Sequence, residues 1–129
     1  MDLSVFDSTA DNGEWLVLLD PITLEPTDAE ILLSGEDSKN YRDAQKKILN
    51  RRLKQRNIQL TADVLEKEAE LTLIAAVKDW KNISMGQEPL ACTPENVAML
   101  FAQPRFKWIK KKIDEFVSNE ANFIKISEK

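Results

Sequence analysis

The sequence contains no histidine, one cysteine and three glycines. Without histidine, the chain cannot build a Ser-His-Asp triad, a Cys–His dyad or a metal site with imidazole ligands. The single thiol, Cys92, excludes an internal disulfide and argues against a structural zinc site. Gly13, Gly35 and Gly86 are too far apart to form a phosphate-binding loop. We therefore expect no enzymatic activity, no metal and no cofactor.

The sequence also lacks any apolar run near the roughly 20 residues that span a bilayer, so no membrane association is expected. Its first residues carry no basic region of the kind that begins a signal peptide. Its 129 residues suit one domain, which we divide into three parts. These are an acidic N-terminal arm with a hairpin over 1–37, a helical core over 38–119 and a tail over 120–129.

Charge is unevenly distributed along the chain. Residues 1–37 contain ten acidic side chains and no lysine or arginine, whereas residues 39–56 contain eight basic side chains and one acid, Asp43. This division predicts attraction between the two segments, within the fold or between subunits. The alternative is a solvated helix face and a solvated loop that do not interact. The residues assigned to self-association are Arg51, Arg52 and Lys54.

Two short apolar runs near the N-terminus, at 14–19 and 29–33, predict an antiparallel hairpin. Asp20-Pro21 and Pro26 lie between them and favour a turn. Because an isolated two-stranded ribbon is only marginally stable in water, the hairpin must pack on helices or pair with another chain.

Helical periodicity dominates the remaining sequence and predicts helices near 38–56, 62–82, 94–102 and 104–119. The clearest start signal is Thr93-Pro94-Glu95, which places a capping hydroxyl, a proline and an acid in favourable order. The predicted fold class is therefore mainly α, a small domain of about four helices with a short N-terminal β-hairpin. The residues expected to be largely buried are Leu49, Leu53, Leu65, Ile74, Val77, Leu100, Ile109 and Ile113.

Several segments, in this order, resemble the small tail assembly chaperones of long-tailed bacteriophages. Trp15-Leu16 and Leu19-Asp20-Pro21-Ile22-Thr23 are similar to the opening strand and turn of that family. The segments 37–53 and 75–80 resemble its first helix and the end of its second helix. Residues 92–106 and 119–123 resemble its C-terminal half. The resemblance covers roughly 14–124, although the family often has glycine where this chain has Lys81-Asn82.

The resemblance implies a non-enzymatic protein of the host bacterial cytoplasm that is absent from the mature virion. Such chaperones bind the long, apolar tape-measure protein, keep it soluble and help recruit the major tail protein. The family often makes a longer form by ribosomal frameshifting, and the opposite charge blocks favour a homo-oligomer or a row of copies. The alternatives are a virion component, such as a head–tail connector or tail-completion protein, and a nucleic-acid-binding module on the basic helix.

Large aromatic side chains are the candidates for partner binding, since such anchors concentrate binding energy. The alternative for these residues is burial in the protein's own core. Trp108 lies off the apolar stripe of the last predicted helix and is therefore the better surface candidate. The complete candidate set is Trp80, Phe101, Phe106 and Trp108.

Overall fold

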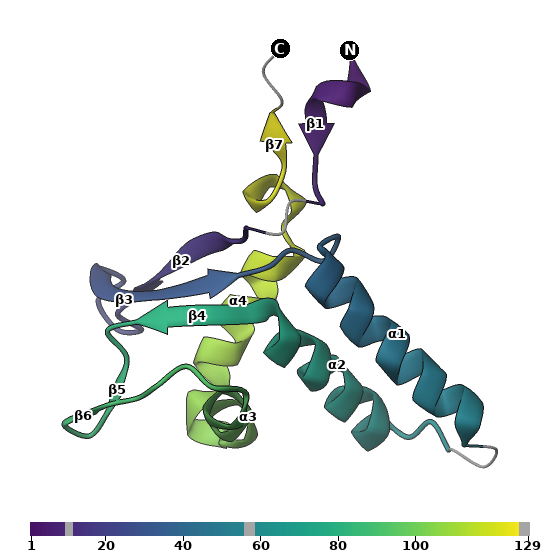
Figure 1. Cartoon of the computed structure of the whole chain (residues 1–129). Coiled ribbons are helices and arrows are strands. Elements are labelled where there is room, and N and C mark those ends of the chain that lie inside the picture. The colour runs from purple at the N-terminus through teal and green to yellow at the C-terminus, as the bar shows by residue number, and fades with distance from the viewer. Residues whose placement is uncertain (10–11, 56–58, 127–129) are drawn as a thin grey trace.

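The computed structural model describes residues 1–9, 12–55 and 59–126. A three-stranded antiparallel sheet in the order β2-β3-β4 lies beside four α-helices (Figure 1). The sheet strands are β2 (Glu14–Leu19), β3 (Pro26–Leu33) and β4 (Val77–Lys81). The helices are α1 (Lys39–Lys54), α2 (Ala62–Ala76), α3 (Pro94–Ala102) and α4 (Lys107–Ser118). The short elements are η1 (Leu3–Val5), β1 (Phe6–Asp7), β5 (Ser84–Met85), β6 (Glu88–Pro89), η2 (Pro104–Phe106), η3 (Glu120–Asn122) and β7 (Lys125–Ile126).

The predicted fold class was wrong, because the protein is a mixed α/β domain rather than a mainly helical one with a single hairpin. The helix expected over 62–82 ends at Ala76, and the chain continues without a loop into β4. That strand pairs with β3, with Ile31 opposite Trp80. The backbone groups of β3 that face away from β2 need hydrogen-bond partners, and β4 supplies them.

The core forms where the sheet meets α3 and α4. Ile31 and Leu33 of β3 are almost completely buried, and Trp80 of β4 is 8% exposed. They belong to one apolar cluster with side chains of the C-terminal helices. Those helix residues are Val97, Leu100, Phe101, Ile113 and Val117. The predicted hairpin is therefore present, but it is part of a sheet that encloses the core.

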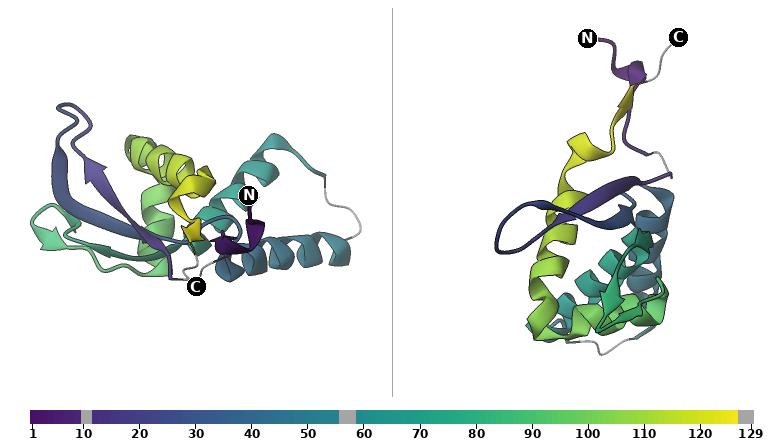
Figure 2. Two further views of the ribbon diagram at one scale, coloured as in Figure 1. Left: turned by 90° about the horizontal axis from the view of Figure 1, so that it is seen from above. Right: turned by 90° about the vertical axis from the view of Figure 1, so that its left-hand side faces the viewer.

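The helical pair α1–α2 extends away from the sheet, with the two helices side by side (Figure 1, Figure 2). The expected burial of Leu49, Leu53 and Leu65 was wrong, since their side chains are 54%, 74% and 47% exposed. The physical reason is that, among the described elements, α1 packs mainly on α2, and this pair extends away from the sheet, so part of its apolar surface stays uncovered. Leu100 and Ile113 are buried as expected. The other three expected core residues, Ile74, Val77 and Ile109, are half-buried.

A buried turn connects β3 to α1. Ser34 and Ser38 are fully buried, and the amide of Ser34 donates to the carbonyl of Ala76 at 2.8 Å. The hydroxyl of Ser38 accepts from the amide of Tyr41 and caps α1. Gly35 lies against the ring of Phe123, where an added Cβ would come within 2.7 Å of a ring carbon. The turn therefore joins the sheet, the start of α1, the end of α2 and the C-terminal segment.

The first and last described segments form a separate two-stranded ribbon. Phe6 of β1 pairs with Ile126 of β7, and Asp7 pairs with Lys125. Figure 1 shows this ribbon standing away from the sheet, with β1 and β7 side by side. Among the described residues, no helix is both long and apolar enough to cross a membrane.

Replacing each of the two serines of the β3–α1 turn by alanine should have a different effect on the free energy of unfolding. Ser38→Ala removes the cap of α1 and should lower the free energy of unfolding by about 1 kcal/mol. Ser34→Ala should leave it unchanged or raise it, because the Ser34 hydroxyl is buried without a hydrogen-bond partner among the described residues. Urea unfolding followed by tryptophan fluorescence measures both values. Equal losses in the two variants would contradict this account of the turn.

Candidate binding pocket

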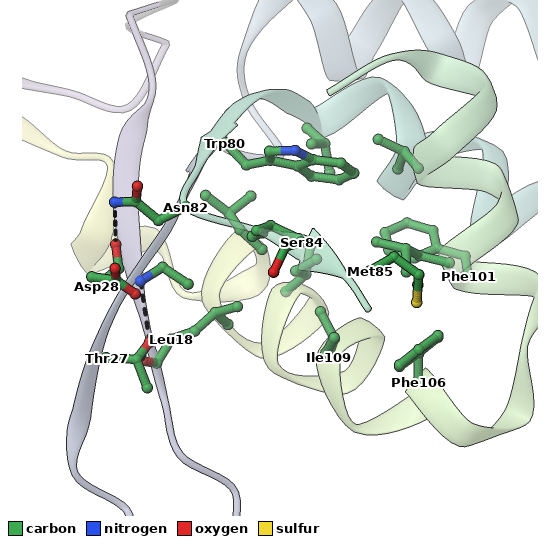
Figure 3. Close-up of a pocket in the computed structure, with 17 residues that line it drawn as sticks. Leu18, Thr27, Asp28, Trp80, Asn82, Ser84, Met85, Phe101, Phe106 and Ile109 are labelled. Atoms are coloured by element: carbon green, nitrogen blue, oxygen red, sulfur yellow. Dashed lines mark hydrogen bonds between the residues drawn. The ribbon is translucent and has the colours of Figure 1, made fainter. Parts of the chain in front are cut away.

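An apolar pocket of about 320 Å³ lies between the sheet and the helices α3 and α4, beside β5. Figure 3 shows aromatic and aliphatic side chains from several elements pointing into it. The apolar lining consists of Leu18, Ala29, Ile31, Val77, Trp80, Ile83, Met85, Val97, Leu100, Phe101, Phe106, Ile109 and Ile113. Three of the four aromatic candidates identified from the sequence are in this list. Pockets that bind ligands commonly have this mainly apolar character.

Trp80 is held in place by two independent constraints. Its position in β4, opposite Ile31, directs the indole into the core. Its Nε1–H also donates to the carbonyl of Leu90 at 2.7 Å. Because this ring is both buried and hydrogen-bonded, it forms a fixed wall of the pocket rather than a freely exposed anchor.

Phe101 and Phe106 form the wall contributed by α3 and η2. Phe101 is 7% exposed and belongs to the core, whereas Phe106 is half-buried. The helix that carries Phe101 begins as the sequence predicts, with the Thr93 hydroxyl accepting from the amide of Asn96. The guanidinium of Arg105 stacks 4.7 Å from the centre of the Phe106 ring. Arg105 therefore covers one face of the Phe106 ring, and Phe106 also lines the pocket.

The mouth of the pocket is polar and carries one carboxylate. Thr27, Asp28, Asn82 and Ser84 are exposed residues of the lining, and no lysine or arginine among the described residues lines the pocket. Asn82 adopts a φ of 58°, a left-handed conformation that asparagine tolerates better than most residues. Its side-chain amide donates to the backbone carbonyl of Asp28 at 2.9 Å, which ties the residue after β4 to β3 at the pocket mouth (Figure 3).

The remaining candidates lie elsewhere. Trp108 is half-buried on α4 and does not line the pocket. Arg51, Arg52 and Lys54 lie in the last turn of α1. Arg52 donates to both carboxylate oxygens of Glu68 on α2, and these hydrogen bonds hold the pKa of Glu68 below its usual range.

Two ion pairs of the acidic hairpin involve lysines outside α1. Glu14 pairs with Lys125, and Glu30 lies 4.0 Å from Lys81. The ammonium of Lys81 also lies 4.1 Å from the centre of the Trp15 ring. These contacts do not test the attraction predicted between the hairpin and α1. That attraction, including contact between two copies, stays a prediction.

Sequence reasoning found Trp80 of β4 but missed the pocket residues that follow this strand and form β5. Ile83, Ser84 and Met85 follow β4 and cover one side of the cavity. The signal that could have found them is Gly86, which has a φ of 66° in the turn between β5 and β6. A glycine between two short segments is typical of a tight hairpin.

Cys92 packs against the core rather than acting as an exposed thiol. Burial, and secondarily the charge of Asp79, raise the pKa of this thiol. The thiolate that reacts with electrophiles is therefore scarcer than for a free cysteine at the same pH.

Alkylation of Cys92 by iodoacetamide at a mildly alkaline pH should thus be slower than that of a cysteine in a short peptide. Asp79→Asn should accelerate it, because a carboxylate that disfavours the thiolate is removed. Mass spectrometry follows the modification, and the urea-unfolded protein is the control, since it should react at the peptide rate. Faster alkylation of the folded protein would contradict the raised pKa.

Comparison of the chain with protein-family models, with curated proteins and with solved structures finds no match.

Proposed function

We propose that this protein is a non-enzymatic tail assembly chaperone that binds an apolar segment of a phage tape-measure protein. The observation that carries the proposal is the apolar pocket bounded by Trp80, Phe101 and Phe106. The order of the family-like segments along the chain supports the same function.

The pocket suits one bulky side chain of a partner helix. Its volume of about 320 Å³ exceeds that of a single leucine or phenylalanine side chain, and its walls are already in place. Transfer of such a side chain from water contributes about 1.5–3 kcal/mol. An amphipathic helix that lays its apolar face over a groove is an established way for a protein to recognise a partner. Repeated over many copies, such contacts would cover a long apolar rod until tail-tube subunits replace them.

The carboxylate of Asp28 gives the pocket a preference in charge. Within the part of the chain that the structure describes, it is the one charged side chain that lines the pocket. A partner helix with lysine or arginine beside its apolar anchor is therefore favoured over one with acidic flanks. This preference makes the proposed segment apolar with basic neighbours.

Co-expression with the tape-measure protein of the same phage tests the proposal. Ser84 is an exposed residue at the pocket mouth, and Ser84→Arg should obstruct the pocket without removing a core contact. The wild-type protein should keep the tape measure soluble and co-purify with it, whereas Ser84→Arg should recover at least about tenfold less complex, the equivalent of roughly 1.4 kcal/mol. Ser118→Arg, which adds the same side chain at an exposed position on the last residue of α4, is the matched control.

A tape measure that is equally soluble with and without the protein would contradict the chaperone function. Equal recovery with Ser84→Arg and Ser118→Arg would instead show that the pocket is not the contact. Two further measurements separate the alternatives. Detection of the protein in purified virions would favour a connector or tail-completion protein, and a salt-sensitive gel shift would favour nucleic-acid binding.

A further inference from the structure

The acidic hairpin tip and the basic last turn of α1 lie at opposite ends of the molecule. Residues 20–25, which connect β2 to β3, form the tip of the hairpin, and the last turn of α1 lies at the far end of the helical pair. Figure 1 and the left view of Figure 2 place these features on opposite sides of the molecule. The tip therefore cannot contact the end of α1 in its own chain, and any contact between them must join two copies.

The hairpin tip, residues 20–25, presents apolar side chains on a well-defined loop. The carboxylate of Asp20 accepts hydrogen bonds from the amides of Ile22 and Thr23, at 2.8 and 3.1 Å. The backbone of Asp20 also bonds to Leu24 and Glu25. These bonds hold Ile22 90% exposed and Leu24 65% exposed. A loop held in this way loses little conformational entropy when it binds.

Leu24 supplies a second indication that the tip has a use. Its φ is 62°, in the left-handed region that leucine rarely adopts. The conformation costs free energy, and a side chain that is 65% exposed recovers little of it by packing within the chain. Backbone strain of this kind is more common in loops that bind than in loops that only connect strands.

The opposite end of the molecule carries a groove of complementary character. We define the basic groove as the crevice of about 450 Å³ between α1 and α2, lined by Arg51, Gln55, Val64, Lys67, Glu68 and Leu71. Glu68 is neutralised by Arg52, so Arg51 and Lys67 determine the charge of the groove. Leu71 is 38% exposed at its floor. An apolar floor with basic edges matches an apolar side chain flanked by acids.

We propose that the hairpin tip of one copy docks in the basic groove of a second copy, with Ile22 on Leu71 and Glu25 facing Arg51 and Lys67. Because the tip and the groove are different surfaces at opposite ends, the contact is heterologous and repeats into an open row of copies. This inference goes beyond the proposed function and does not depend on it, since it uses only the charge, exposure and placement of these residues.

Two variants, each lacking one half of the contact, test the proposal. The tip variant is Ile22→Ser with Glu25→Gln, which leaves the hydrogen bonds of Asp20 in place. The groove variant is Arg51→Gln with Lys67→Gln, which retains the Arg52–Glu68 pair. Sedimentation velocity of the full chain measures association across a range that reaches about 1 mM.

The wild-type protein should form species that lengthen with concentration. They should dissociate as salt reduces the screening length from about 10 Å at 0.1 M to about 3 Å at 1 M. Each variant alone should be monomeric. An equimolar mixture should form 1:1 dimers and nothing longer, because one intact tip meets one intact groove and no further contact remains.

Three results would overturn the proposal. They are a monomeric wild-type protein at every concentration in low salt, association of either variant alone to the wild-type extent, and a mixture that stays monomeric. A symmetric dimer that ignores both pairs of substitutions would point to another surface, such as Leu49 and Leu53. Since none of these readouts involves the tape-measure protein, failure here is distinct from failure of the chaperone function.

Discussion

Strand β4 begins at the residue that follows α2, and this direct connection determines where most of the chain can lie. Pairing of β4 with β3 fixes the end of α2 beside the sheet, where the amide of Ser34 reaches the carbonyl of Ala76. The same pairing places Trp80 opposite Ile31 and so builds the wall against which α3 and α4 pack. Without β4, the hairpin would be an isolated ribbon of marginal stability. The pocket would also lack the wall that Val77 and Trp80 form.

The sequence predicts those elements whose ends carry their own chemistry. The hydroxyls of Ser38, Thr61 and Thr93 each accept from a backbone amide at a helix start, and the helices begin there as expected. The strand β4 carries no such signal at its first residue. The run Leu71–Val77 is apolar except for Thr72, so periodicity cannot distinguish a buried helix from a helix that becomes a strand. The choice depends on the unpaired edge of β3, which is a tertiary contact.

The candidate site was predictable in its composition and not in its geometry. Aromatic size identified Trp80, Phe101 and Phe106, and the structure brings these three to one cavity. Aromatic size could not decide between a partner site and the alternative of core burial, which holds for Trp80 and Phe101. It also gave no sign that Ser84 and Met85 complete the pocket. The leucines of α1 show the opposite error. An amphipathic stripe indicates that a helix has an apolar face, but only the arrangement of neighbouring elements decides whether that face is covered.

The ribbon of β1 and β7 joins residues that are almost the whole chain apart in sequence, with Phe6 opposite Ile126. Closing so long a loop has a large entropic cost that a ribbon with two residues in each strand recovers poorly. It therefore forms after the rest of the domain has folded and opens before the core does. The amide hydrogens of β1 and β7 should exchange by local opening, while those of the β3–β4 pairing exchange only when the domain unfolds.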